Sequence, residues 1–335
     1  MLKMNSKRWA ALGVAVVLFF ISVFYQFSVS RSDEGGYEAL LGDSEFKEKV
    51  IRAGKTPLSP TIVVLNLEGI ILDVGDIGFM SPTGYNHRQF LKMIEQAGED
   101  DRVEGIILRV NSPGGGVVES AEVYDKLLEV RESTNKPIYV SMGNTAASGG
   151  YYVSAPADKI VAHPGTVTGS IGVIMESINY AELAEDIGID FNTITSGEFK
   201  DIMSSSRPMT EEEEAILQSI VDEMYDDFVQ AIVNGRGMSE ADVRKVADGR
   251  IYTGKQAKEV GLVDELGTLD DTIALLEEDH GLKGANVVEY EMGFDVFQLF
   301  GFTAKNLFQK DTDLHSLINL IRDTSGPRAM YLYSR

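Results

Sequence analysis

The sequence predicts an α/β protein built on a largely parallel sheet and followed by a mainly helical C-terminal part. Between Thr61 and Ala162, short apolar runs of strand length alternate with amphipathic stretches of helical length. Two of the apolar runs lead directly into glycine-rich turns. Strands that alternate with helical patterns are typical of βαβ units, in which the strands run parallel. Beyond Met209 the helical spacing predominates.

The predicted elements follow one another in a regular order. Strands are expected at residues 61–69, 103–110, 136–142 and 159–162, and helices at residues 85–97 and 119–131. The first of these helices carries Phe90, Leu91 and Ile94 on one face. In the C-terminal part, Thr210 precedes four glutamates, which favours a helix N-terminus because carboxylates there complement the helix dipole.

The N-terminus predicts a membrane anchor. No charged residue lies between Arg8 and Arg31, and the apolar stretch from Trp9 to Phe27 exceeds the roughly 18 residues that mark a spanning helix. Lys and Arg before it predict a cytoplasmic N-terminus, with the bulk of the protein outside. A cleaved secretory signal is the alternative, because residues 28–30 are small. Its apolar core of about 7–15 residues would be shorter than this one, which favours the anchor.

We therefore divide the chain into four parts. Residues 1–30 form the cytoplasmic tip and anchor, 31–60 a linker, 61–285 the α/β domain, and 286–335 an apolar C-terminal extension. Within the extension, the stretch from Tyr290 to Phe308 is rich in Phe and Leu. It is open whether this stretch belongs to the core, to a contact between subunits or to a membrane-surface patch.

Composition excludes several classes of function. The formal net charge of −22 argues against nucleic acid as a partner, because neutralising phosphates needs clustered Lys and Arg. The absence of cysteine excludes a disulfide, a thiolate nucleophile and a Cys-ligated zinc. No metal-ligand spacing is present, so we expect no cofactor.

Ser148 is the candidate nucleophile. It lies in Ala146-Ala-Ser-Gly-Gly-Tyr-Tyr152, after a predicted strand, where two glycines suit a tight turn into a helix. Such a turn presents the serine Oγ at the mouth of a helix N-terminus, whose free N–H groups stabilise negative charge. The alternative is a Gly-Ser loop without chemistry.

A second glycine turn lies upstream, in Asn111-Ser-Pro-Gly-Gly-Gly116, and follows another predicted strand. A phosphate loop is excluded because the Walker spacing is absent. Neighbouring parallel strands would place both turns at one edge of the sheet. Two backbone N–H groups that face a serine oxygen form an oxyanion hole, worth about 3–4 kcal/mol per donor in acyl transfer.

Two residues compete for the role of the base. His163 follows a strand at a Pro-Gly turn and would allow a Ser-His-Asp triad, although histidines at strand ends are commonly structural. Lys200, in Ser196-Gly-Glu-Phe-Lys-Asp-Ile-Met203, is the favoured candidate. A lysine base requires a pKa of about 7–8, which burial supplies, and the hydroxyl of Ser170 is placed to orient it.

These segments together resemble the signal peptide peptidase A family of Ser-Lys serine peptidases, in its half-length form. Further matching segments include Tyr85-Asn-His-Arg88, Thr168-Gly-Ser-Ile-Gly-Val173 and Ala247-Asp-Gly-Arg-Ile-Tyr252. The resemblance covers nearly the whole chain, from the anchor to Met330-Tyr-Leu-Tyr333. It implies a core of repeated ββα units, of the Clp protease and crotonase type.

The resemblance also assigns roles to residues. It implies that Ser148 is the nucleophile, Lys200 the general base and Ser170 the residue that orients the lysine. Gly149, with Gly114 or Gly115, would supply the oxyanion N–H groups. The family assembles into a dome-shaped homo-oligomer, an octamer, in which the lysine can face the serine of a neighbouring subunit. Spacing alone leaves open whether the pair forms within one subunit or between two.

We therefore expect a membrane-anchored, extracytoplasmic endopeptidase that cleaves remnant signal peptides and other short or unfolded peptides. A second hypothesis is that the tail at 328–333 occupies a neighbour's cleft as a self-substrate, because it is short, apolar and terminal. Two other classes remain open. One is an enzyme of the same superfold that acts on acyl-CoA thioesters, and the other is a non-catalytic membrane scaffold.

Overall fold

The structure is a computed structural model that describes residues 46–56, 58–74, 85–292 and 329–333. The strands are β1 (Phe46–Arg52), β2 (Thr61–Glu68), β3 (Val103–Ser112), β4 (Gly114–Gly116), β5 (Ile138–Ala147), β6 (Lys159–Ala162), β7 (Val167–Gly169), β8 (Ile251–Thr253), β9 (Glu265–Leu266), β10 (Asn286–Met292) and β11 (Met330–Leu332). The helices are α2 (His87–Glu99), α3 (Val117–Thr134), α4 (Gly149–Tyr152), α5 (Ala181–Asp186), α6 (Glu211–Arg236), α7 (Glu240–Val246), α8 (Gly254–Glu259) and α9 (Leu269–His280).

A nine-stranded sheet forms the centre of the described fold, in the order β1-β10-β2-β3-β5-β6-β9, with β7 and β8 joined through β5. All pairs along β10, β2, β3, β5, β6 and β9 are parallel, whereas β1 pairs with β10 antiparallel. The predicted α/β class with a largely parallel sheet is therefore confirmed. A separate two-stranded sheet joins β4 to β11.

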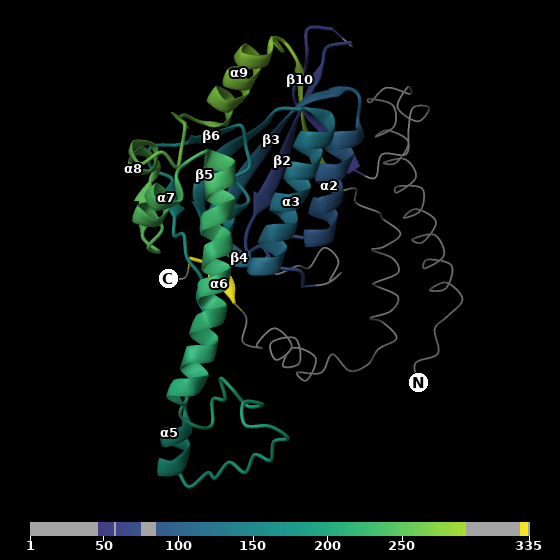
Figure 1. Cartoon of the computed structure of the whole chain (residues 1–335). Helices are drawn as coiled ribbons and strands as arrows, with labels where there is room; N and C mark the ends of the chain where they lie inside the picture. Colours follow the sequence, from purple (N-terminus) through teal and green to yellow (C-terminus); the bar gives the residue numbers. More distant parts are fainter. Residues whose placement is uncertain (1–45, 57, 75–84, 293–328, 334–335) are drawn as a thin grey trace, which may run out of the picture. The chain divides into compact units, whose positions relative to one another are not determined.

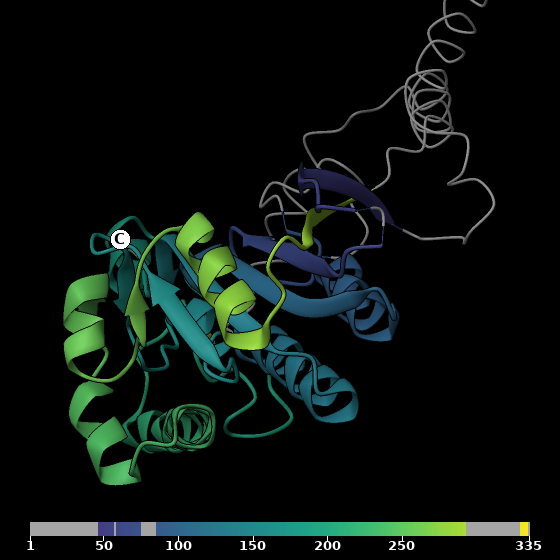
Figure 2. The same ribbon diagram turned by 90° about the horizontal axis from the view of Figure 1, so that it is seen from above.

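Helices cover both faces of the sheet, with α2 and α3 on one side and α9 on the other (Figures 1 and 2). Alternate residues of β2 serve the two layers: Val63 packs in the core that includes Phe90 of α2, and Ile62 packs in the core that includes Leu276 of α9. This two-sided burial explains why the strands are continuously apolar in sequence.

The predicted strands all form, with shifted ends. The strand predicted at 136–142 runs on as β5 to Ala147, and the helix predicted at 119–131 extends to Val117–Thr134. The remaining strands of the described residues were not predicted, and the two longest of these are β1 and β10. β1 lies within the stretch interpreted as a linker, and β10 lies within the stretch interpreted as a C-terminal extension.

The helical C-terminal part forms as predicted, and α6 is its longest helix. Thr210 is its N-cap and makes a capping box with Glu213, as the acidic start of the segment suggested. From the sheet, α6 runs out toward α5 (Figure 1).

The predicted anchor at 9–27 lies outside the described residues. In the part of the chain that is described, no helix combines the length and apolarity that a membrane crossing requires.

Candidate active site

The two glycine turns meet at one edge of the sheet. β3 and β5 run parallel with Ser112 opposite Ala146, so the turns that follow them emerge side by side. A Cβ on Gly149 would lie 3.1 Å from both the Cα of Gly114 and the N of Gly115. Only glycines permit so close an approach of two backbones.

Ser148 sits between β5 and α4 in a conformation that non-glycine residues rarely adopt, with φ 53° and ψ −118°. Its N–H donates to the carbonyl of Gly169 at 2.8 Å, and its carbonyl accepts from the N–H groups of Tyr151 and Tyr152. These contacts hold the residue in a strained geometry, as is common at functional sites. The Ser148 side chain is buried, and its Oγ makes no hydrogen bond with the described residues.

The N–H groups around this serine differ in what they contact. The N–H of Gly149 is the first of α4 and makes no backbone hydrogen bond within the described residues. The N–H of Gly114 donates to the Oγ of Ser112 at 3.0 Å. Gly115 pairs with Tyr331 across the β4–β11 ladder. The three glycines named from the sequence therefore lie together, and each has a different contact.

Ser120 is a residue that sequence reasoning missed. It lies in the first turns of α3, is fully buried, and its hydroxyl has no hydrogen-bond partner among the described residues. A Cβ on Gly149 would come within 2.6 Å of this hydroxyl. The spacing of Ser120 from the glycines could have drawn attention to it, but nothing in the sequence indicates that α3 packs on the turn that contains Gly149.

The end of the chain lies along the glycine turn as an added strand. β11 pairs antiparallel with β4, and the N–H of Tyr333 donates to the carbonyl of Pro113 at 2.8 Å. On its other edge, Met330 exchanges two backbone hydrogen bonds with Ile174, at 3.0 and 3.1 Å. The tail is thus hydrogen-bonded on both sides, the mode in which extended peptides are bound by sheet edges. It occupies the cleft of its own chain, whereas the sequence hypothesis assigned it to a neighbour's.

The side chain of Tyr331 fills an aromatic pocket. Its ring stacks on Tyr152 at 5.0 Å between centroids and lies 4.6 Å from Phe228 of α6. Its hydroxyl donates to the carbonyl of Met224 at 2.8 Å. The pocket therefore accepts an aromatic ring and offers an acceptor for a phenol at its end.

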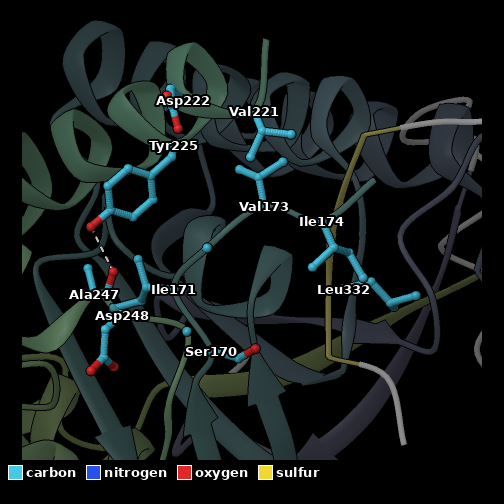
Figure 3. A pocket seen from close by; sticks show the side chains of 12 residues that line it. Ser170, Ile171, Val173, Ile174, Val221, Asp222, Tyr225, Ala247, Asp248 and Leu332 are labelled. Carbon is cyan, nitrogen blue, oxygen red and sulfur yellow. Dashed lines mark hydrogen bonds between the residues drawn. The ribbon is translucent and has the colours of Figure 1, made fainter. Parts of the chain in front are cut away.

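A cavity of about 480 Å³ lies beside the tail, between the segment after β7 and α6 (Figure 3). Its lining residues are Ser170, Ile171, Gly172, Val173, Ile174, Val221, Asp222, Tyr225, Ala247, Asp248, Gly249 and Leu332. Ser170 stands at its edge with φ 51°, held by a 2.8 Å hydrogen bond from its N–H to the carbonyl of Arg250. The hydroxyl proposed to orient the lysine therefore faces open space.

Lys200 lies apart from Ser148 in the same chain. It is exposed, and its Nζ makes no hydrogen bond or ion pair with the described residues. Its neighbour Asp201 is bound through Arg207 to Glu213, at the start of α6. Phe228, which packs on Tyr152 near the serine, is fifteen residues further along α6, or about 22 Å along the helix axis. A lysine side chain cannot span that separation.

His163, the alternative base, is exposed on the loop after β6. Its Nδ1 accepts a hydrogen bond from the N–H of Gly165 at 3.1 Å, and it lines a second cavity of about 270 Å³ beside Arg109. No hydrogen bond joins a histidine to Ser148 in the described residues. The described residues also contain no group of three or more His, Asp or Glu side chains arranged to hold a metal ion.

Comparisons with known proteins place the chain among serine peptidases. Residues 130–283 match the model of peptidase family S49. Over 98% of its length, the chain is 40% identical to "Putative signal peptide peptidase SppA" of Enterococcus faecium, and the match covers 99% of that protein. It is 35% identical to "Protease 4" of Salmonella typhi over 71% of this chain and 38% of the relative. "Serine protease SPPA, chloroplastic" of Arabidopsis thaliana is 34% identical over 57% of this chain and 28% of the relative.

Proposed function

We propose, from the premise that this chain belongs to peptidase family S49 and is a serine peptidase, that it cleaves remnant signal peptides and other short or unfolded peptides. The observation that carries this proposal is the added strand β11. A peptide segment lies extended beside Ser148, with hydrogen bonds to β4 on one edge and to Ile174 on the other. A site of this shape accepts an unfolded chain and excludes a folded one.

The chemistry follows from the position of Ser148. Its Oγ attacks the peptide carbonyl while the Lys200 amine accepts the hydroxyl proton, giving a tetrahedral oxyanion. The resulting ammonium then protonates the leaving amine, and the C–N bond breaks to leave an acyl-enzyme. Water, deprotonated by the same amine, releases the acid and restores the serine. Helix α4 begins at the residue after Ser148, which supports the placing of the oxyanion at its N-terminus.

Gly149 and one of the two upstream glycines would donate to the oxyanion. The N–H of Gly149 has no backbone partner, which supports its role. The choice between Gly114 and Gly115 stays open, because the N–H of Gly114 donates to Ser112 and Gly115 pairs with Tyr331 of the tail. Substrate binding would then use the same glycine strand as the chain's own tail.

Lys200 would serve the Ser148 of a neighbouring subunit. Its exposure and the length of α6 that separates it from its own Ser148 support a shared site. Ser170 of the subunit that carries the serine would then accept a hydrogen bond from the incoming ammonium. Its position at the edge of an open cavity is compatible with that approach.

An exposed apolar surface supports assembly. We call it the arm surface: the exposed large apolar residues between 174 and 194, namely Ile174, Ile178, Tyr180, Leu183, Ile187, Ile189, Phe191 and Ile194. Contiguous exposed apolar surface is uncommon on monomers and marks contact sites. These residues precede Lys200 in the same segment, so burying them against another subunit would also deliver the lysine. We propose a homo-oligomer, with the dome-shaped octamer as the expected form.

The membrane anchor at 9–27 would hold the catalytic domain on the extracytoplasmic side, beside the signal peptides that remain in the membrane after secretion. The tail would act as a substrate mimic and a site of self-cleavage. An intact-mass measurement that finds the C-terminus unprocessed after long incubation would count against self-cleavage.

Mixing two inactive variants tests the shared site. Ser148→Ala and Lys200→Ala alone should each lose peptide cleavage by at least about 10⁴-fold while keeping their assembly. Co-assembled in equal amounts, they should regain about a quarter of the native activity, because each site needs one residue from each of two subunits. No regain would overturn the shared site, and substantial activity of Lys200→Ala alone would overturn the base.

The same proteins separate the rival functions. Labelling by a serine-directed covalent inhibitor, lost in Ser148→Ala, would exclude a non-catalytic scaffold. Turnover of acyl-CoA thioesters at a rate above peptide cleavage would favour the alternative enzyme of the same superfold.

A further inference from the structure

Arg207 connects the turn that carries Lys200 to helix α6. Its Nε and Nη2 donate to the two carboxylate oxygens of Asp201, at 2.8 and 2.7 Å. Its Nη1 donates to Glu213 at 2.8 Å, and its Nη2 also contacts the second oxygen of Glu213. One guanidinium therefore binds two carboxylates in a planar, bidentate manner that a lysine could not reproduce.

The α6 side of this connection is firmly held. Glu213 has only 2% of its side chain exposed, and it accepts a hydrogen bond from the N–H of Thr210 at 2.9 Å. The hydroxyl of Thr210 in turn accepts from the N–H of Glu213. The hydrogen bonds from Arg207, followed by those from Thr210, lower the pKa of Glu213 to about 2. The carboxylate is thus ionised near neutral pH.

The lysine side is a compact turn. The N–H of Lys200 donates to the carbonyl of Gly197, and the N–H of Ser204 donates to the carbonyl of Asp201. Asp201 directly follows Lys200, and the hydrogen bonds from Arg207 hold the pKa of its carboxyl below the usual range. An ionised carboxylate therefore lies one residue from the proposed base.

That carboxylate opposes general-base chemistry. A base must lose its proton near the working pH, and a neighbouring negative charge favours the ammonium form. The guanidinium of Arg207 compensates the charge of Asp201. The other ionisable groups of this turn and of the first turn of α6 are carboxylates without an arginine partner among the described residues, namely Glu198, Glu211, Glu212 and Glu214. The compensation at Asp201 is therefore the main positive contribution near Lys200 from its own subunit.

We propose that Arg207 is a positioning residue for Lys200. It fixes the lysine-bearing turn on the first turn of α6, and it pairs Asp201 so that this carboxylate does not keep the lysine protonated. The inference rests on the proposed role of Lys200 as the base, but it assigns Arg207 a function that the dyad itself does not require.

The pH profile of Arg207→Gln tests this on the full-length assembled protein. We expect kcat for a short peptide to fall about tenfold or more near neutral pH, with KM little changed. The acid limb of the kcat/KM profile should move to higher pH, because an unpaired carboxylate at Asp201 adds negative charge beside the base. Arg244→Gln is the matched control: Arg244 of α7 also binds two carboxylates, Asp226 of α6 and Glu240 of its own helix, and its loss should leave the profile unchanged.

A second pair of variants separates charge from folding. In Asp201→Asn, the acid limb of the kcat/KM profile should move to lower pH, because the carboxylate beside the base is gone. Arg207 should still bind Glu213 in this variant. In the double variant Arg207→Gln with Asp201→Asn, the acid limb should return toward its native position. In Arg207→Lys, the limb should lie between those of the native protein and Arg207→Gln.

A limb that stays in place in both Arg207→Gln and Asp201→Asn would overturn the inference, as would equal losses in Arg207→Gln and Arg244→Gln. If Arg207→Gln does not assemble, the shift in Asp201→Asn alone decides. A wrong assignment of the base would give a different result. In that case Lys200→Ala would stay active, whatever the pH profiles of the Arg207 variants show.

Discussion

Individual glycines at this site are required by specific contacts. Gly114 has φ +102°, and a Cβ there would lie 2.0 Å from the carbonyl oxygen of Tyr331 and 2.6 Å from the N of Gly149. Both the pairing of β4 with β11 and the position of Gly149, the proposed oxyanion donor, therefore depend on the missing side chain. Ser148 illustrates the converse, because a non-glycine residue is held at positive φ by three backbone hydrogen bonds.

We predict that Gly114→Ala abolishes peptide cleavage, by about 100-fold or more, because both oxyanion donation and strand pairing are disturbed. The strain at positive φ should also cost about 1–3 kcal/mol of unfolding free energy. Steady-state kinetics and denaturant titration measure the two effects. Gly237→Ala is the control: it has φ +63° but nothing within 4 Å of the new Cβ, so it should lose some stability and keep its activity.

At the scale of elements, β11 occupies the edge of β4 that we propose for the substrate. It pairs with β4, and its Tyr331 is anchored by Tyr152 and Phe228. The tail therefore has to leave before a peptide can bind in the same place. Tyr331 is the fully buried residue of β11, whereas Met330 and Leu332 are partly exposed.

We expect Tyr331→Ala to free the tail and raise the initial rate on short peptides by a few fold, seen as a lower KM. The tail should also become sensitive to limited proteolysis by an added protease. Tyr331→Phe keeps the ring and loses only the hydrogen bond to Met224, worth about 1 kcal/mol, so it should lie between the native protein and the alanine variant. A KM unchanged in Tyr331→Ala would show that the tail does not compete with the substrate.

The strands show how much of the fold could be predicted from the sequence pattern. The strands 61–69, 103–110, 136–142 and 159–162 were all predicted, because each is an apolar run buried on both faces. β1 was missed because it is an edge strand whose residues are mostly exposed and charged, so it resembles a linker. β10 was missed because its first residues pair with β2, which is more than 200 residues distant in the chain.

At the scale of the whole molecule, the proposed site would be incomplete in one subunit. Ser148 and its glycines are in place, whereas Lys200 projects from an exposed segment preceded by the arm surface. Assembly would therefore switch on activity and confine it to the oligomer. Other proteins would be protected from unassembled chains, because a single chain would be inactive.

The arm surface predicts the effect of charge on assembly. Leu183→Glu and Ile178→Glu, at residues that are 64% and 74% exposed, should shift the particle toward monomers in sedimentation experiments and lower peptide cleavage at least tenfold. Leu58→Glu is a control at a residue that is 95% exposed and lies outside the arm, and it should change neither. An arm variant that stays fully assembled and active would remove this surface from the interface.

The sequence by itself predicted the α/β class and the peptidase family, which are confirmed, and it named candidate residues for the chemistry, whose roles stay predictions. It could do so because buried strands, glycine turns and family motifs are local patterns in the chain. Only the tertiary structure decided that β4 presents an edge to the tail, that Arg207 joins Asp201 to Glu213, and that α6 separates Lys200 from its own Ser148. The residue types in these contacts are common, so the sequence pattern does not mark them. Packing between elements far apart in the chain brings these residues together or keeps them apart.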